Sequence, residues 1–175
     1  MGRSALSPAR GAAIGRGPHR AALAIPAISV LLAMLFLLLP IVSKTGWWPD
    51  AGLLMLLAWR LLRADAWPAW VAAPLGLAHD LLTGAPIGLA TSLWPIFMLA
   101  FDVIDRRTMW RDYWIEWMLA TLFIAAFIVA QWQVAAWDGA AVPFTSVAPA
   151  ILVGITCFPV AAFIVARLDR WRLGR

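Results

Sequence analysis

Charge is scarce in this chain of 175 residues. Only 13% of the residues are Asp, Glu, Lys or Arg, whereas 63% are apolar and the mean hydropathy is +0.83. Soluble domains carry about 25% charged residues, so this composition predicts a protein that is solvated by lipid. The formal net charge of +5 could indicate nucleic acid. However, the basic residues lie between apolar runs, as the positive-inside rule of membrane proteins predicts, and we expect no nucleic acid partner.

Residues that build reactive centres are also missing. The single cysteine, Cys157, excludes an intramolecular disulfide or a cysteine-based metal site, and we interpret it as a buried structural residue. Two histidines cannot form a metal site by themselves, and the chain has no GK[ST] P-loop, no HExxH and no GxSxG motif. We therefore expect no enzyme activity, no catalytic residue, no cofactor and no bound metal.

Long apolar runs fill most of the remaining sequence. The first run, residues 21–42, is long enough for a membrane core that needs about 20 residues, and no signal-peptide cleavage site follows it. Five more runs follow, at residues 48–62, 66–82, 87–104, 114–137 and 147–166. The second and third runs are short, so each could also be a half-span or a re-entrant segment. We predict an all-α polytopic membrane protein, with one six-helix domain over residues 21–168 between basic tails at 1–20 and 169–175.

The placement of charge tests this number of crossings independently. With a cytoplasmic N-terminus, six crossings leave only Lys44 outside. The basic residues placed inside are Arg3, Arg10, Arg16, Arg20, Arg60, Arg63, Arg106, Arg107, Arg111, Arg167, Arg170, Arg172 and Arg175. This asymmetry predicts that both termini are cytoplasmic. Most tryptophans fall at predicted span ends, and we interpret Trp94, near mid-span, as packing between helices rather than as a ligand wall.

The stretch GLAHDLLTGAPIG, residues 76–88, places an aspartate in an apolar run and then interrupts its own helix. On one continuous helix, every fourth residue would form a ridge along which a second helix could pack closely: Ala72, Gly76, Asp80, Gly84 and Gly88. A charge in the bilayer is costly, so Asp80 should face protein or water. Two interpretations stay open: Asp80 accepts hydrogen bonds from backbone N–H groups around residues 83–88, or it contacts a ligand, a lipid headgroup or a partner subunit.

Three smaller expectations follow from local spacing. His79 could bond Thr83, one helical turn away. Asp102 and Arg106 are four residues apart and could form an interfacial ion pair, while Asp105 would belong to the cytoplasmic loop. Four prolines should kink or start their helices: Pro26, Pro95, Pro149 and Pro159.

Several of these features occur in an order that is typical of one family. Trp47-Trp48-Pro49-Asp50 opens the second apolar run, and a GxxxDLxxGxPxG signature, Gly76 to Gly88, follows it. A charged loop with Arg106-Arg107 comes next, and Phe158-Pro159 leads into the basic Arg167-Leu168-Asp169-Arg170. On these residues, positions 20–172 resemble the rod-shape-determining protein MreD family.

This resemblance implies a non-enzymatic, multi-pass component of the bacterial inner membrane that belongs to the cell-wall elongation machinery. Its partners would be an MreC-type bitopic protein, the RodA glycan polymerase, a class B penicillin-binding transpeptidase, MreB (directly or through the others) and membrane lipids. The implied fold is similar to that of the substrate-binding subunits of energy-coupling-factor vitamin transporters. The signature positions Gly76, Asp80, Gly84, Pro86 and Gly88 would form a partner-binding or core motif, and Pro49 and Asp50 a structural one.

We expect partner helices to bind along the small-residue ridge, so that Gly76→Leu would abolish partner binding without preventing membrane insertion. A rival hypothesis is a carrier or transporter subunit that binds a small molecule near Asp80. A third is an enzyme acting on a lipid-linked precursor.

Overall fold

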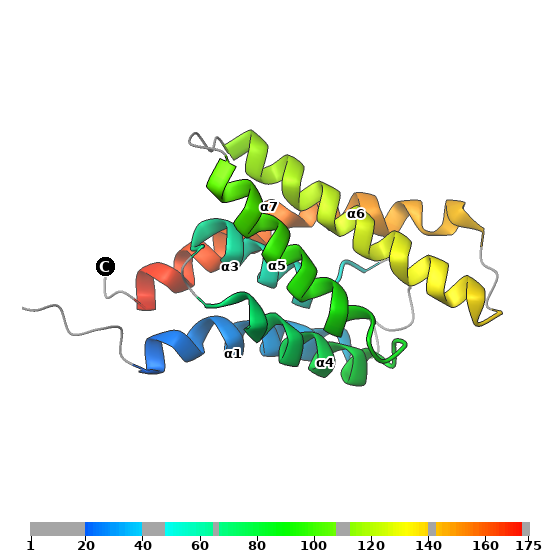
Figure 1. Ribbon diagram of the computed structural model, residues 1–175, viewed down its shortest axis with the longest axis horizontal. Helices are drawn as coiled ribbons and strands as arrows, with labels where there is room; N and C mark the ends of the chain where they lie inside the picture. The colour runs from blue at the N-terminus through cyan, green and yellow to red at the C-terminus, as the bar shows by residue number, and fades with distance from the viewer. Residues whose placement is uncertain (1–19, 40–47, 65–66, 108–112, 140–142, 173–175) are drawn as a thin grey trace, which may run out of the picture.

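The computed structural model of this protein describes residues 20–39, 48–64, 67–107, 113–139 and 143–172 (Figure 1). These residues form α-helices and two short 3-10 turns, Ala69–Val71 and Phe144–Ser146, and they contain no strand. The α-helices are α1 (Arg20–Leu37), α3 (Ala51–Leu62), α4 (Ala72–Thr83), α5 (Leu89–Arg107), α6 (Tyr113–Trp137) and α7 (Ala148–Arg172). Of the tails predicted at 1–20 and 169–175, residues 1–19 and 173–175 lie outside the described residues, as do Lys44, Trp47 and Arg111. Arg20 instead begins α1, and residues 169–172 continue α7.

Each predicted apolar run overlaps one of these helices, with ends that differ by up to six residues, so the all-α prediction is confirmed for the part of the chain that is described. Two of the helical segments, Tyr113–Trp137 and Phe144–Arg172, are long and apolar enough to cross a membrane. Only 22% and 17% of their most apolar windows are buried within the protein. The core helix of a soluble protein would be mostly buried, so these exposed apolar surfaces are consistent with a helical membrane protein.

The short helix α3 forms the centre of the molecule. Ten of its twelve residues are buried, because α1, α6 and α7 all pack against it. At about 1.5 Å per residue it is about 18 Å long, which is less than the hydrocarbon core of about 30 Å. The second apolar run therefore forms a protected central helix that is too short to cross a bilayer core alone.

Helices α4 and α5 form a tightly packed pair. In Figure 1 the α4–α5 and α6–α7 connections lie to the right, while the start of α1 and the end of α7 lie to the left. We call the right side the junction end. We call the left side the arginine end, because α3 and α7 end there and carry these arginines close to their last turns: Arg60, Arg63, Arg167, Arg170 and Arg172. The start of the first described helix and the end of the last therefore lie on the same side of the molecule.

Of the four prolines singled out in the sequence, one lies at the start of a helix and three lie inside helices. Pro149 occupies the first turn of α7, where a missing backbone N–H costs nothing. Pro26, Pro95 and Pro159 lie inside α1, α5 and α7. Near the first of these, the Ser29 hydroxyl donates to the Pro26 carbonyl at 2.7 Å, so a side chain joins the backbone bonding of that turn.

Candidate functional site: the junction of α4 and α5

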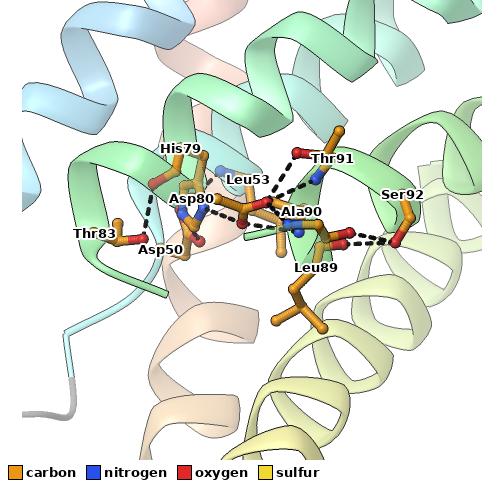
Figure 2. A network of polar contacts seen from close by, with 10 residues as sticks. Asp50, Leu53, His79, Asp80, Thr83, Leu89, Ala90, Thr91 and Ser92 are labelled. Carbon is orange, nitrogen blue, oxygen red and sulfur yellow. Dashed lines mark hydrogen bonds and ion pairs between the residues drawn. The ribbon is translucent and has the colours of Figure 1, made fainter. Parts of the chain in front are cut away.

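Asp80 lies near the end of α4, and its carboxylate accepts four hydrogen bonds from the start of α5 (Figure 2). Oδ1 accepts from the N–H of Ala90 at 2.9 Å, and Oδ2 accepts from the N–H of Gly88 at 3.0 Å and of Thr91 at 3.2 Å. The Thr91 hydroxyl also donates to Oδ2, at 2.9 Å. The first N–H groups of a helix lack partners within it, and the helix dipole favours a negative charge there. Asp80 is therefore the N-terminal cap of α5, supplied by the neighbouring helix.

This geometry confirms the structural interpretation of Asp80, with donors at residues 88–91 rather than 83–88. The carboxylate is buried, and both of its oxygens are used within the chain. The cap explains how a charged group is tolerated in an apolar chain, because a buried carboxylate is stable only when it is hydrogen-bonded or paired.

Glycines make the sharp connection between the two helices possible. Gly84 ends α4 with φ +67°, and Gly88 precedes α5 with φ +109°, both in the region that L side chains rarely adopt. Pro86 lies between them, and its carbonyl accepts from the N–H of Leu89 at 3.2 Å. The break predicted from the sequence is therefore a compact turn at the junction end.

Gly76 faces the start of α5 at very close range. A Cβ at Gly76 would lie 2.4 Å from the carbonyl oxygen of Ala90 and 2.7 Å from the backbone nitrogen of Thr91. The absence of a side chain lets Asp80, one turn further along α4, reach the first N–H groups of α5. The prediction of one continuous ridge from Ala72 to Gly88 is wrong, because α4 ends at Thr83 and the Gly76 face is occupied by α5 of the same chain.

Asp50 and His79 join this junction to the central helix. Asp50 caps α3 by accepting from the N–H of Leu53 at 2.9 Å. Its Oδ2 lies 2.7 Å from Nε2 of His79, while Nδ1 of His79 lies 3.9 Å from Oδ1 of Asp80. Neither ring nitrogen is aligned as a hydrogen bond, so these are polar contacts that become ion pairs only when His79 is protonated. The predicted bond from the His79 side chain to Thr83 is wrong, because the Thr83 hydroxyl donates to the His79 backbone carbonyl at 2.8 Å.

Aromatic side chains enclose the buried imidazole. The ring centroid of His79 lies 5.0 Å from that of Trp94 and 5.8 Å from that of Phe127. Trp94 is fully buried, so the prediction that it packs between helices is confirmed. The pairing of His79 with Asp50 was not predicted from the sequence. The residue types were visible, but they lie 29 positions apart and only tertiary contacts join them.

A pocket of about 330 Å³ opens beside Asp50 at the junction end. The start of α3, the last turns of α6 and the start of α7 form its walls, with Trp48, Gln131, Trp132 and Ser146 among the lining residues. The Asp50 side chain is 14% exposed. A second pocket, of about 340 Å³, lies against the turn and is lined by Pro86, Gly88 and Ser92. Asp80 lines neither pocket, whereas Asp50 lines the first.

At the arginine end, ion pairs tie α3 to α5 and α7. Arg60 is 3% exposed, and its Nη2 lies 2.5 Å from Asp102 and 3.0 Å from Asp105. Arg63 lies 3.0 Å from Asp169 of α7. Asp102 thus pairs with α3, whereas the predicted partner, Arg106, has a side chain outside the described part. The placement of Asp105 in a loop is wrong, since α5 continues to Arg107.

The described residues contain no group of three or more His, Cys, Asp or Glu side chains that could hold a metal ion. Comparison with protein-family models, with curated proteins and with solved structures finds no match for this chain. The residues and their geometry are therefore the basis on which a function can be inferred.

Proposed function

We propose that this protein is a non-enzymatic inner-membrane subunit of the bacterial cell-wall elongation complex, and that it contributes to rod shape by binding partner membrane proteins. The observation that carries this proposal is the structural role of the GxxxDLxxGxPxG signature, whose residues build the junction between α4 and α5. Gly76 allows the close approach of α5, Asp80 caps α5, and Gly84 and Gly88 form the turn between the helices. A signature that builds a rigid helix junction suits a scaffold better than a reactive centre.

Both oxygens of the Asp80 carboxylate already accept hydrogen bonds from the protein, and this supports the proposal that the protein is not an enzyme. A general acid or base must reach a proton on the substrate, within about 3 Å or through one water. Both Asp80 oxygens instead accept bonds from the protein itself, and the side chain is buried. This arrangement also weakens the hypothesis of an enzyme that acts on a lipid-linked precursor.

The protein exposes apolar surfaces that other membrane helices could cover, and these surfaces support the proposal that it binds membrane partners. A groove of about 530 Å³ runs over α3 between α1 and α7 and contains small residues as well as large ones, including Ala33, Ala51, Cys157 and Ala161. Helix pairs in lipid pack through small residues because these let the backbones approach. On α6, Met118 and Leu122 are 68% and 60% exposed and form a second apolar surface.

The test is a tagged pull-down from native membranes, with the recovered proteins identified by mass spectrometry. We expect an MreC-like bitopic protein together with a RodA-type polymerase and a transpeptidase. Recovery of ATPases with a coupling subunit, or of no membrane protein, would contradict the proposal.

Photocrosslinking then locates the contact. A photoreactive residue replacing Val160 probes the groove, and one replacing Met118 probes α6; both native side chains are more than half exposed. Crosslinks to the bitopic protein from one position and not the other would assign the surface. Crosslinks from neither would count against direct binding through these helices.

The second candidate, a carrier subunit that binds a small molecule, is favoured by one observation. The pocket beside Asp50 is open at the junction end and partly polar. On this alternative the ligand lies at Asp50 rather than at Asp80. Native mass spectrometry of the purified protein separates the two, because a carrier would retain one small ligand per chain in the absence of partner proteins.

A further inference from the structure

The pocket beside Asp50 combines a carboxylate, an amide and two indole side chains. Asp50 lines it from the start of α3, Gln131 and Trp132 from α6, and Trp48 from the residues before α3. A volume of about 330 Å³ lies at the small end of the about 300–1,000 Å³ that is typical of ligand sites. The space therefore suits a headgroup-sized molecule.

Negative charge dominates this end of the described structure. The carboxylates here are Asp50, Asp80 and Asp138, whereas the arginines whose side chains are described lie at the arginine end. Even when His79 is protonated, the group of Asp50, His79 and Asp80 keeps a net charge of −1. Asp80 is buried and saturated by hydrogen bonds from α5, whereas the Asp50 side chain, beside His79, is 14% exposed and lines the pocket. Asp50 is therefore the member of this group that a ligand in the pocket can approach.

These features select a ligand of one chemical class. A phosphate or carboxylate group would be repelled by Asp50, whereas an ammonium group would gain a charge-assisted hydrogen bond from it. Indole rings such as those of Trp48 and Trp132 also attract ammonium groups through their faces. The amide oxygen of Gln131 supplies a further acceptor for an N–H donor.

We propose that the Asp50 pocket binds the ammonium group of an amine-bearing molecule. The ammonium can belong to a phosphatidylethanolamine headgroup or to a free amine of similar size. Trp48 and Trp137 at the same end mark the depth at which headgroups lie, so both sources can reach the pocket. Such a ligand would bind to this chain alone, whichever proteins the chain also binds.

The first experiment measures lipid retention. The protein is reconstituted in vesicles of equal parts phosphatidylethanolamine and phosphatidylglycerol, extracted, and examined by native mass spectrometry. We expect phosphatidylethanolamine to be retained over phosphatidylglycerol by about tenfold, the effect of one charged contact. The substitution Asp50→Asn should remove this preference, and it keeps a good cap for α3 because asparagine is also a strong N-cap residue.

Two further variants make the result specific. Asp138→Asn removes an exposed carboxylate at the same end that does not line the pocket, and it should keep the wild-type preference. Gln131→Leu changes the pocket wall without touching the α3 cap, and it should weaken retention even if Asp50→Asn fails to fold.

The second experiment identifies the source of the amine. The thermal stability of the protein in phosphatidylglycerol alone is measured with ethanolamine and with ethylene glycol as the uncharged control. Stabilisation by ethanolamine that Asp50→Asn abolishes supports a free amine, while lipid preference without this effect supports the headgroup. The proposal is overturned if Asp50→Asn changes neither the retention of phosphatidylethanolamine nor the stabilisation by ethanolamine. It is also overturned if the only effect of Asp50→Asn is a weaker recovery of a partner protein in the pull-down.

Discussion

At the residue scale, Asp80 shows how a carboxylate becomes a structural element in an apolar protein. An isolated charge at the bilayer centre costs about 2.5–3.5 kcal/mol on insertion scales. Here three backbone N–H groups and one hydroxyl surround the charge, and each of them would itself be costly to leave unpaired. The carboxylate and the start of α5 therefore stabilise each other.

Removing this cap should destabilise the whole protein. For Asp80→Ala we expect a loss of at least about 3 kcal/mol in the free energy of unfolding, because several buried donors lose their acceptor at about 1–3 kcal/mol each. Asp80→Asn should cost less, since one oxygen remains. The measurement is thermal or denaturant unfolding in detergent, with Asp138→Ala as the exposed control. An Asp80→Asn protein of wild-type stability would contradict the capping role and favour a role in binding.

At the element scale, the approach of α4 to α5 depends on a missing side chain. The position that a Cβ of Gly76 would take is already in contact with the backbone of Ala90. Backbone atoms cannot rotate away as the end of a long side chain can, so any larger residue must separate the helices. Separation would also pull Asp80 away from the N–H groups that it caps.

We therefore expect Gly76→Leu to disturb folding and not partner binding alone, in contrast to the expectation from the sequence. The cost should exceed the about 1–3 kcal/mol that is usual for overpacking, because the clash is with backbone. Ala126→Leu adds similar bulk at an exposed position on α6 and should change stability little. Gel filtration and thermal unfolding of both variants provide the measurement. A monodisperse Gly76→Leu protein of unchanged stability would contradict the observed packing.

Buried charge also organises the elements at the arginine end. Arg60 is held by two carboxylates of α5, and Arg63 by one of α7, so the end of the short central helix is tied to both neighbours. In two of these pairs one member is buried and the other is exposed by 41% (Asp102) or 39% (Arg63), so the pair itself adds little net stability. Removing the exposed member would leave a buried charge without that partner. These contacts therefore set the position of α3 within the bundle more than they add to net stability.

At the scale of the whole molecule, the two ends differ in charge. Described arginines gather at one end and the Asp50 pocket lies at the other. Under the positive-inside rule, the arginine end would face the cytoplasm, where it could also attract anionic headgroups. The junction end and its pocket would then face outward.

Thiol labelling tests this orientation. In a Cys157→Ala background, Ser146→Cys reports on the junction end and Ala64→Cys on the arginine end, and both native residues are exposed. A membrane-impermeant thiol reagent added to intact spheroplasts should label the first variant and reach the second only after the membrane is permeabilised. The reverse pattern, or labelling of both from outside, would contradict the predicted topology.

The sequence by itself determined the helical content, the approximate helix positions, the break at Gly84–Gly88 and the need of Asp80 for polar contacts away from lipid. These follow from local physics, since apolar run length, glycine at positive φ and the cost of a bare carboxylate can all be read within about fifteen residues. Only the tertiary structure decided that Asp50 meets His79, that Arg60 meets Asp102, and that the Gly76 face is filled by α5. Those pairings join distant helices, and apolar composition does not specify which helix faces which. Close packing and the satisfaction of buried charge select the arrangement.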